Sequence, residues 1–164
     1  MKGLTLTQPW ASLVAAGVKT IETRSWRSDY RGPIAIHAAK GLAGLRGSWP
    51  CAGANPTLDE LGEFVDSQPR MLDALLDEYG QFFRAGELPR GAIVAVAVLV
   101  DIVSTSDALG FDFIDDELPF GNFAPGRWAW VMSDVKPIKP PVEIPSGAVR
   151  NYRGLWDVPT LVRP

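Results

Sequence analysis

The sequence is poor in the residues that build metal centres and disulfides. Its 164 residues include one cysteine, Cys51, and one histidine, His37. A single cysteine excludes an internal disulfide, and together these two residues are too few for a Cys/His zinc cluster. The sequence also lacks a P-loop, a dinucleotide-binding fingerprint and a nucleophile elbow. We therefore expect no cofactor and predict no metal site, although composition alone leaves carboxylate-rich metal sites open.

Long hydrophobic runs are missing as well. The longest apolar stretch, Ala92 to Val100, is too short to span a bilayer. The N-terminal residues lack the extended apolar region and the small-residue cleavage site of a signal peptide. These features, with the single cysteine, predict a cytoplasmic protein that has no membrane partner. The sequence gives no indication of the oligomeric state.

The charge is small overall but unevenly distributed. The formal net charge is −3, yet residues 1–46 hold seven Lys/Arg against two acids, and the segment from Arg127 onward holds six against three. Residues 57–90 hold three Lys/Arg against eight acids, and residues 107–117 hold five acids and no Lys/Arg. If the basic ends meet in the fold, they would form a local positive surface suited to an anionic ligand or a short stretch of nucleic acid. Coating of long duplexes usually requires a more basic domain.

The order of elements predicts a single α+β domain over residues 1–164. Alternating or compact apolar runs predict strands, and a capping box at Thr57–Glu60 followed by apolar residues at helical spacing predicts two helices. The expected strands are 3–7, 19–26, 34–39, 92–104, 127–133 and 155–158, with a helix over 9–17, a helical insertion near 57–86, and long loops over 40–55 and 107–126. Because strands outnumber helices and several connections are short, we expect a small mixed β-barrel with peripheral helices.

The stretch Gly17-Val18-Lys19-Thr20-Ile21-Glu22-Thr23-Arg24-Ser25-Trp26 is the main candidate for a site. A glycine that ends a helix is followed by a strand that carries a cation, a carboxylate and a second cation. Lys19 and Glu22 would lie on opposite faces of a regular strand, so their convergence would require a bulge or a twist. Converging in a cleft, Lys19 would contact phosphate or serve as a proton donor or base, and Glu22 would accept from an amine or act as a general base. The alternative is an exposed strand with an ordinary ion pair, which stabilises little.

Six tryptophans are many for this length, and several stand beside polar residues. Trp10 follows Gln8-Pro9, Trp26 is close to Arg24, and Trp128 follows Arg127. Tryptophan in a small barrel commonly fills the core. Beside cations and amides it can instead stack on a nucleobase, which contributes roughly 1–3 kcal/mol per base.

His37 and Lys40 form a further polar pair at the end of the strand predicted over residues 34–39. His37 is either a core-edge histidine or a hydrogen-bond donor that faces the cleft. The candidate ligand-binding residues are therefore Gln8, Trp10, Lys19, Glu22, Arg24, Trp26, His37, Lys40, Arg127 and Trp128. If the protein is an enzyme, Lys19 and Glu22 are the catalytic candidates.

Two motifs make the chain resemble the activating-signal-cointegrator-homology (ASCH) family. These are Leu4-Thr5-Leu6-Thr7-Gln8-Pro9-Trp10-Ala11 and the Gly-x-Lys-x-x-Glu-x-Arg pattern of residues 17–24. Residues 34–39, 126–130 and 154–156 are similar to later elements of that family. The resemblance implies a PUA-like β-barrel whose cleft is lined by the motif, with a role in binding RNA or DNA. Some small members are amidohydrolases acting on N4-acetylcytidine, but these carry threonine where this chain has Glu22.

Three functional hypotheses follow. The first is a module that holds a nucleobase or the end of an RNA or other single strand in the motif cleft. The second is a hydrolase acting on a modified nucleoside, such as an N4-acylated cytidine, with Lys19 as base and Glu22 as proton shuttle. The third is a protein-interaction domain that uses the acidic helices near 57–86.

Overall fold

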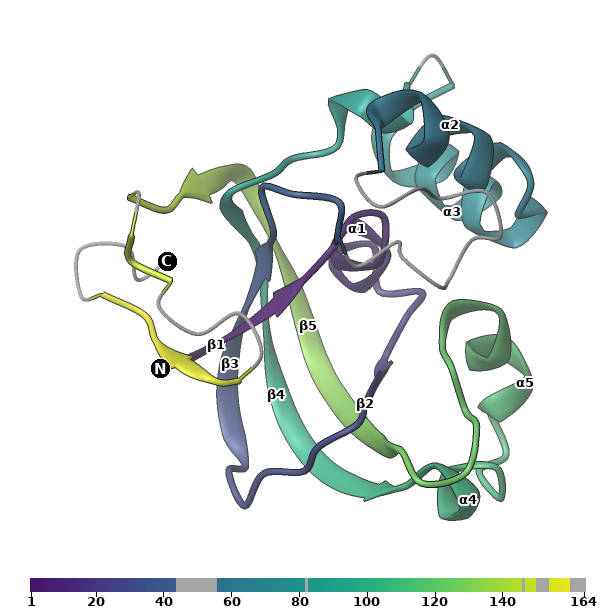
Figure 1. Cartoon of the computed structure of the whole chain (residues 1–164), viewed down its shortest axis with the longest axis vertical. Helices are drawn as coiled ribbons and strands as arrows, with labels where there is room; N and C mark the ends of the chain where they lie inside the picture. Colours follow the sequence, from purple (N-terminus) through teal and green to yellow (C-terminus); the bar gives the residue numbers. More distant parts are fainter. Residues whose placement is uncertain (44–55, 82, 146, 150–153, 160–164) are drawn as a thin grey trace.

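The computed structural model describes residues 1–43, 56–81, 83–145, 147–149 and 154–159. In this part of the chain, strands form a mixed sheet in the order β2-β5-β4-β3-β1-β6, with helices around it (Figure 1). β1 and β3 are parallel, and the other neighbouring strands are antiparallel. The strands are β1 Lys2–Leu6, β2 Ile21–Arg24, β3 Gly32–Ala38, β4 Ala92–Ser104, β5 Trp128–Glu143 and β6 Trp156–Asp157. The helices are α1 Trp10–Ala15, α2 Leu58–Asp66, α3 Pro69–Tyr79, α4 Thr105–Ala108 and α5 Ile114–Glu117, with 3₁₀ turns η2 Ala85–Glu87 and η3 Leu118–Phe120. The α+β fold class predicted from the sequence is confirmed.

The central strands are the most apolar ones, as their sequence predicts. Ile34 and Ile36 of β3 are fully buried, and so are Ala95 and Leu99 of β4. They form the main core with α1, whose Ala11 and Val14 face the sheet. Leu13, on another side of α1, belongs to a second cluster formed by α2 and α3. The short helix α1 therefore lies between the sheet and the helical pair.

Local sequence signals account for the start of α2 and the end of α1. Thr57 accepts a hydrogen bond from Glu60 N at 3.2 Å, and the Glu60 carboxylate accepts one from Thr57 N at 2.6 Å, so the predicted capping box is confirmed. After α1, Gly17 has φ of +78°, a left-handed conformation that glycine adopts without steric cost. The helices α2 and α3 confirm the helical pair expected near residues 57–86. Phe82, which the helical spacing of the sequence places on the apolar face of the second helix, lies outside the described residues.

The sheet curls so that distant strands meet. β2 is at one edge and β1 is the fifth strand in order. Even so, Arg24 Nη2 of β2 donates to the carbonyl oxygen of Thr5 in β1 at 2.6 Å. Figure 1 shows β1 crossing in front of β3, β4 and β5 toward the side on which β2 lies. This curvature gives the sheet a barrel-like shape.

Three expectations about element boundaries need correction. The strand expected over residues 127–133 continues to Glu143 as β5, because residues 136–137 and 142–143 also pair with β4. The strand expected over residues 19–26 is only Ile21–Arg24, because the amides of Thr20 and Ile21 bind a side chain, Glu117, instead of a neighbouring strand. The segment 107–126, expected as an unstructured loop, contains α5, η3 and the end of α4; Ser104 caps α4 by accepting from Asp107 N at 3.0 Å. Most of the loop expected over residues 40–55, including Cys51, lies outside the described residues.

Candidate functional site

A cleft of about 1210 Å³ opens between the two strands that the curled sheet brings together. One wall is the end of β1 with the following residues, and another is β2. The helical pair contributes Phe64 and Gln68, and residues 119–123 complete the lining. Its charged and aromatic lining residues are Trp10, Glu22, Arg24, Lys40, Phe64, Phe120, Phe123 and Arg127. Three cations and one carboxylate therefore lie in one concave surface with four aromatic side chains.

The motif forms a compact ion-pair cluster at the β2 wall. Lys19 is fully buried, and its ammonium group donates to the carbonyl oxygen of Ile21. Lys19 Nζ also lies 3.4 Å from Glu22 Oε2. Lys19 and Glu22 meet because Lys19 precedes β2 and so escapes the alternation of the strand. This is the convergence that a regular strand would have prevented.

Arg24 connects this cluster to the opposite wall of the cleft. Its Nε lies 3.0 Å from Glu22 Oε1, but the N–H direction does not meet hydrogen-bond geometry, and Arg24 Nε is a buried donor with no hydrogen-bond partner in the described part of the chain. Its Nη2 donates to Thr5 O. The guanidinium is thus fixed by one strong hydrogen bond and one ion pair. The side chain is 20% exposed, so a ligand can reach its exposed part but not the buried Nε.

The wall formed by residues 119–123 is tied to β2 through several polar contacts. Arg127 donates from Nε to Asn122 O and from Nη2 to Thr23 O, both at 3.0 Å. Asn122 N donates to Thr23 Oγ1 at 3.1 Å. These contacts hold residues 119–123 against β2.

Glu117 is a site-supporting residue that sequence reasoning did not identify. Its side chain is buried, and it accepts hydrogen bonds from Thr20 N and Thr20 Oγ1 at 2.6 Å each and from Ile21 N at 3.1 Å. It therefore anchors the start of β2, between Lys19 and Glu22. The sequence does not distinguish Glu117 from the other acids of residues 107–117, all of which are exposed. Phe64, Phe120 and Phe123 were likewise not singled out.

Half of the predicted ligand-binding residues line this cleft: Trp10, Glu22, Arg24, Lys40 and Arg127. Gln8 does not line it. Its fully buried amide donates to Ser12 Oγ at 2.9 Å and to Pro89 O at 2.6 Å, and accepts from Ser12 N at 3.1 Å. These contacts satisfy its side chain within the fold, so Gln8 fixes the start of α1. Lys19 also lies behind the cleft wall, beneath Glu22.

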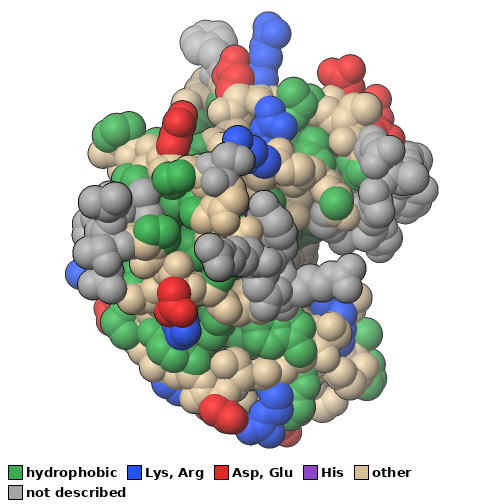
Figure 2. Space-filling model, turned by 60° about the vertical axis from the view of Figure 1, so that its left-hand side comes forward, with side chains coloured by type: hydrophobic (Ala, Val, Ile, Leu, Met, Phe, Trp, Pro, Cys, Tyr) green, Lys and Arg blue, Asp and Glu red, His purple; other side chains and the backbone are tan. Residues whose placement is uncertain are grey.

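His37 belongs to a buried polar chain on the other side of β1. Its Nδ1 lies 3.2 Å from Thr5 Oγ1, which accepts from Trp156 Nε1 at 3.1 Å. Since the hydroxyl accepts from the indole, its own proton is available to Nδ1. Burial lowers the pKa of His37 to about 4, so the imidazole is neutral at pH 7. No histidine is visible on the face drawn in Figure 2, in keeping with its 3% exposure.

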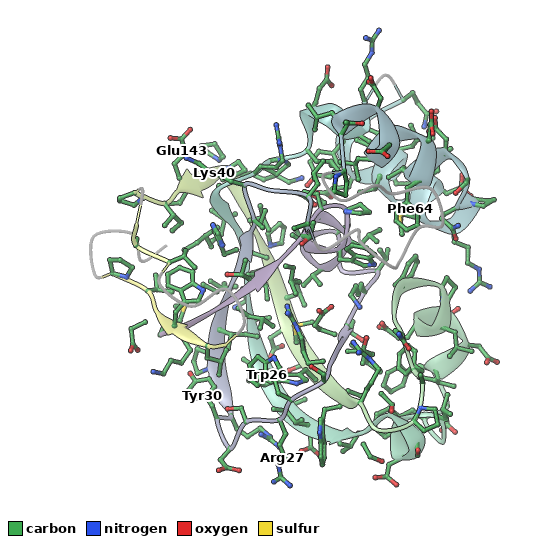
Figure 3. All side chains as sticks on the ribbon, in the orientation of Figure 1. Trp26, Arg27, Tyr30, Lys40, Phe64 and Glu143 are labelled. Carbon is green, nitrogen blue, oxygen red and sulfur yellow. The ribbon has the colours of Figure 1, made fainter. Side chains whose placement is uncertain are left out.

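Trp26 and Trp128 lie away from the cleft. Trp26 packs edge-on against Trp130, with ring centroids 4.5 Å apart, and accepts on its carbonyl oxygen from Trp130 Nε1. Trp128 is covered by the Arg27 guanidinium, 5.0 Å from the ring centroid. Figure 3 shows Trp26 and Arg27 at one end of the molecule and Lys40 and Phe64 toward the other.

Two further searches gave negative results for the described residues. No group of three or more His, Cys, Asp or Glu side chains there is arranged to hold a metal ion. None of the helices described is long and apolar enough to cross a membrane.

The curled mixed sheet thus places part of the motif, Glu22 to Arg24, in a cleft between its approaching strands. A family model for the ASCH domain matches residues 4–141, and the chain belongs to this family. Activating signal cointegrator 1 from Mus musculus is 29% identical over 101 residues, which cover 62% of this chain and 14% of the mouse protein. The chain thus corresponds to a small part of that relative.

Two solved structures are similar. The ASCH protein from Zymomonas mobilis has a TM-score of 0.47 at 14% identity, covering 87% of this chain and 73% of the other. A point mutant of that protein has a TM-score of 0.42 at 14% identity, covering 87% and 75%.

Proposed function

We propose that the cleft binds a short single-stranded segment of RNA or DNA, with phosphate held by cations and at least one base held against aromatic side chains. The observation that carries this proposal is the joint lining of one cleft by Arg24, Lys40 and Arg127 with Trp10 and three phenylalanines. Membership of the ASCH family supports it, because these domains are generally linked to RNA binding.

The size of the cleft favours more than an isolated base. Its volume of about 1210 Å³ exceeds the roughly 300–1,000 Å³ of typical small-molecule sites. A net charge of −3 on the whole chain argues against extended contacts along a duplex. A locally positive cleft on an acidic protein suits a strand that enters only at that point.

The residues divide into three roles. Lys40 is exposed at the cleft, and Arg24 keeps donor capacity, so both are suited to phosphate or a base edge. Trp10 is half-buried, with its ring centroid 5.8 Å from that of Phe64, and supplies a stacking surface. Lys19 is buried behind the cleft wall, where its ammonium group holds the Glu22 carboxylate in place.

The hydrolase alternative has less support from the geometry. Its proposed base, Lys19, is fully buried, and its ammonium group is engaged by Ile21 O and Glu22. Turnover of acylated or alkylated nucleosides in a substrate panel would nevertheless establish it.

The test is titration of fluorescently labelled RNA and DNA pentamers at low salt, followed by anisotropy. We expect saturable binding, and Lys40→Gln to weaken it roughly fivefold to tenfold, because one phosphate-neutralising cation is lost. Lys136→Gln is the matched control: Lys136 is also exposed but does not line the cleft, so this variant should bind like the wild type. Absence of binding, or equal weakening by both variants, would refute the proposal.

A further inference from the structure

The negative charge of Glu22 is unfavourable in a cleft that binds phosphate. It is the one acidic side chain among the described residues that line the cleft, where Arg24, Lys40 and Arg127 also lie. A carboxylate near phosphate lowers affinity by like-charge repulsion. Its presence therefore calls for a ligand group other than phosphate at this point.

The surroundings of Glu22 define that group. Its two oxygens lie 3.4 Å from Lys19 Nζ and 3.0 Å from Arg24 Nε, so the carboxylate is held between two cations and acts as an acceptor. The side chain is still 14% exposed, and it lines the cleft. A ligand atom that reaches it must donate a hydrogen bond.

Arg24 supplies the complementary group beside it. Its side chain is 20% exposed and lines the cleft, and its guanidinium carries N–H donors beyond the one that binds Thr5 O. An acceptor and a donor next to each other match a base edge that carries an exocyclic amino group beside a ring nitrogen acceptor. Adenine and cytosine have such edges, and carboxylates accept from the cytosine N4 amino group in known recognition.

We propose that Glu22 is a specificity-determining residue that selects a base whose Watson–Crick edge carries an exocyclic amino group beside a ring-nitrogen acceptor, as in adenine and cytosine, by accepting a hydrogen bond from that amino group. This inference rests on the proposed function, since it concerns a base held in the same cleft. The competing explanation is that Glu22 only neutralises the buried Lys19. The two explanations differ in one measurable quantity, the preference for amino-bearing bases.

The experiment compares oligomers that differ by the amino group alone. Pentamers of adenosine and cytidine are titrated beside pentamers in which purine replaces adenine and 2-pyrimidinone replaces cytosine. For the wild type, we expect the amino form to bind about tenfold more tightly in at least one pair, the effect of one hydrogen bond to a charged acceptor. In Glu22→Gln this ratio should fall several-fold, because a neutral amide is a weaker acceptor.

A double variant keeps the test independent of folding defects. Lys19→Met with Glu22→Leu replaces the buried ion pair by apolar side chains, a change that is often neutral for stability. We expect it to retain weakened binding through Lys40 and Arg127 but to lose the preference, with a ratio near one. Thermal unfolding of each variant verifies that it is folded.

The outcomes separate the two proposals. A wild-type ratio near one in both pairs, or a ratio that both variants preserve, overturns the role of Glu22 while the binding function stands. A wild type that binds none of the oligomers overturns the proposed function and this inference with it.

Discussion

At the scale of single residues, the candidate site shows that a motif residue need not line the cleft. Lys19 is fully buried under Glu22, so its charge holds the carboxylate that faces the cleft. Breaking a buried ion pair by removing one partner commonly costs about 3–5 kcal/mol. Loss of binding in a Lys19 variant would thus report both stability and site geometry, which is why Lys40 is the better probe of phosphate contact.

His37 gives a pH-dependent prediction at the same scale. Burial lowers its pKa from 6.5 to about 4, so between these pH values the unfolded chain binds a proton that the folded chain does not. The free energy of unfolding should therefore fall as the pH drops from 6.5 to 4, by about 3 kcal/mol from this group. Urea unfolding at a series of pH values measures the change.

The control for this prediction is His37→Gln. Because the sequence contains a single histidine, the variant removes the histidine contribution entirely and leaves that of the carboxylates. Between pH 6.5 and 4 the free energy of unfolding of the wild type should fall by about 3 kcal/mol more than that of the variant. Parallel curves would contradict the assigned effect of burial.

Which residues could be predicted depended on whether their partners are close in sequence. The Gly-x-Lys-x-x-Glu-x-Arg pattern identified Glu22 and Arg24, which line the cleft, as candidates, since the charges lie within one short strand. The pattern could not show that Gln8 is satisfied by Pro89 O, 81 positions away. His37 and Trp26 were likewise ambiguous, because their neighbours Trp156 and Trp130 are distant in sequence.

At the scale of elements, α5 and β2 are linked by the carboxylate of Glu117. This side chain satisfies two backbone amides that no strand partner reaches, those of Thr20 and Ile21. The helix end thus sets where β2 begins and, through it, where Glu22 lies. A cleft wall is positioned by a residue outside the cleft.

The corresponding prediction concerns Glu117→Gln. The amide NH₂ group would face a backbone donor, and the charge-assisted hydrogen bonds would be lost, so we expect about 2 kcal/mol of destabilisation. Chemical denaturation measures it, and amide exchange of Thr20 and Ile21 should accelerate. Asp115→Asn, at an exposed carboxylate of the same helix, should change neither measurement.

The elements themselves were largely predictable, because their signals are local. The capping box of α2 and the apolar runs of β3 and β4 marked those elements close to their observed bounds. The segment 107–126 was not, because α4, α5 and η3 are each only one turn long. Such short helices carry no periodicity and depend on tertiary contacts.

At the scale of the whole molecule, charge sets how binding responds to salt. The face in Figure 2 mixes both signs of charge, and the chain as a whole is acidic. Attraction of a nucleic acid should therefore come from the three cations of the cleft and not from a long-range field. This distinguishes the protein from basic domains that coat nucleic acids.

The salt dependence of binding gives the corresponding prediction. With two to three phosphate contacts, the slope of log K against log salt for a single strand should be about −1.4 to −2. Lys40→Gln should reduce the slope by about 0.7, and Lys136→Gln should leave it unchanged. A steeper slope, or one that Lys40→Gln does not alter, would place the binding surface elsewhere.

The hydrogen bond from Arg24 to Thr5 has a consequence for assembly of the domain. It joins strands separated by three others in the sheet, so the cleft exists only once β5, β4 and β3 have paired in register. A ligand that contacts both strands stabilises the folded chain, and this stabilisation grows with the logarithm of the ligand concentration divided by its dissociation constant. Because binding raises the free energy of unfolding, a compound that occupies the cleft also raises the melting temperature. A melting-temperature screen can therefore search for the natural ligand.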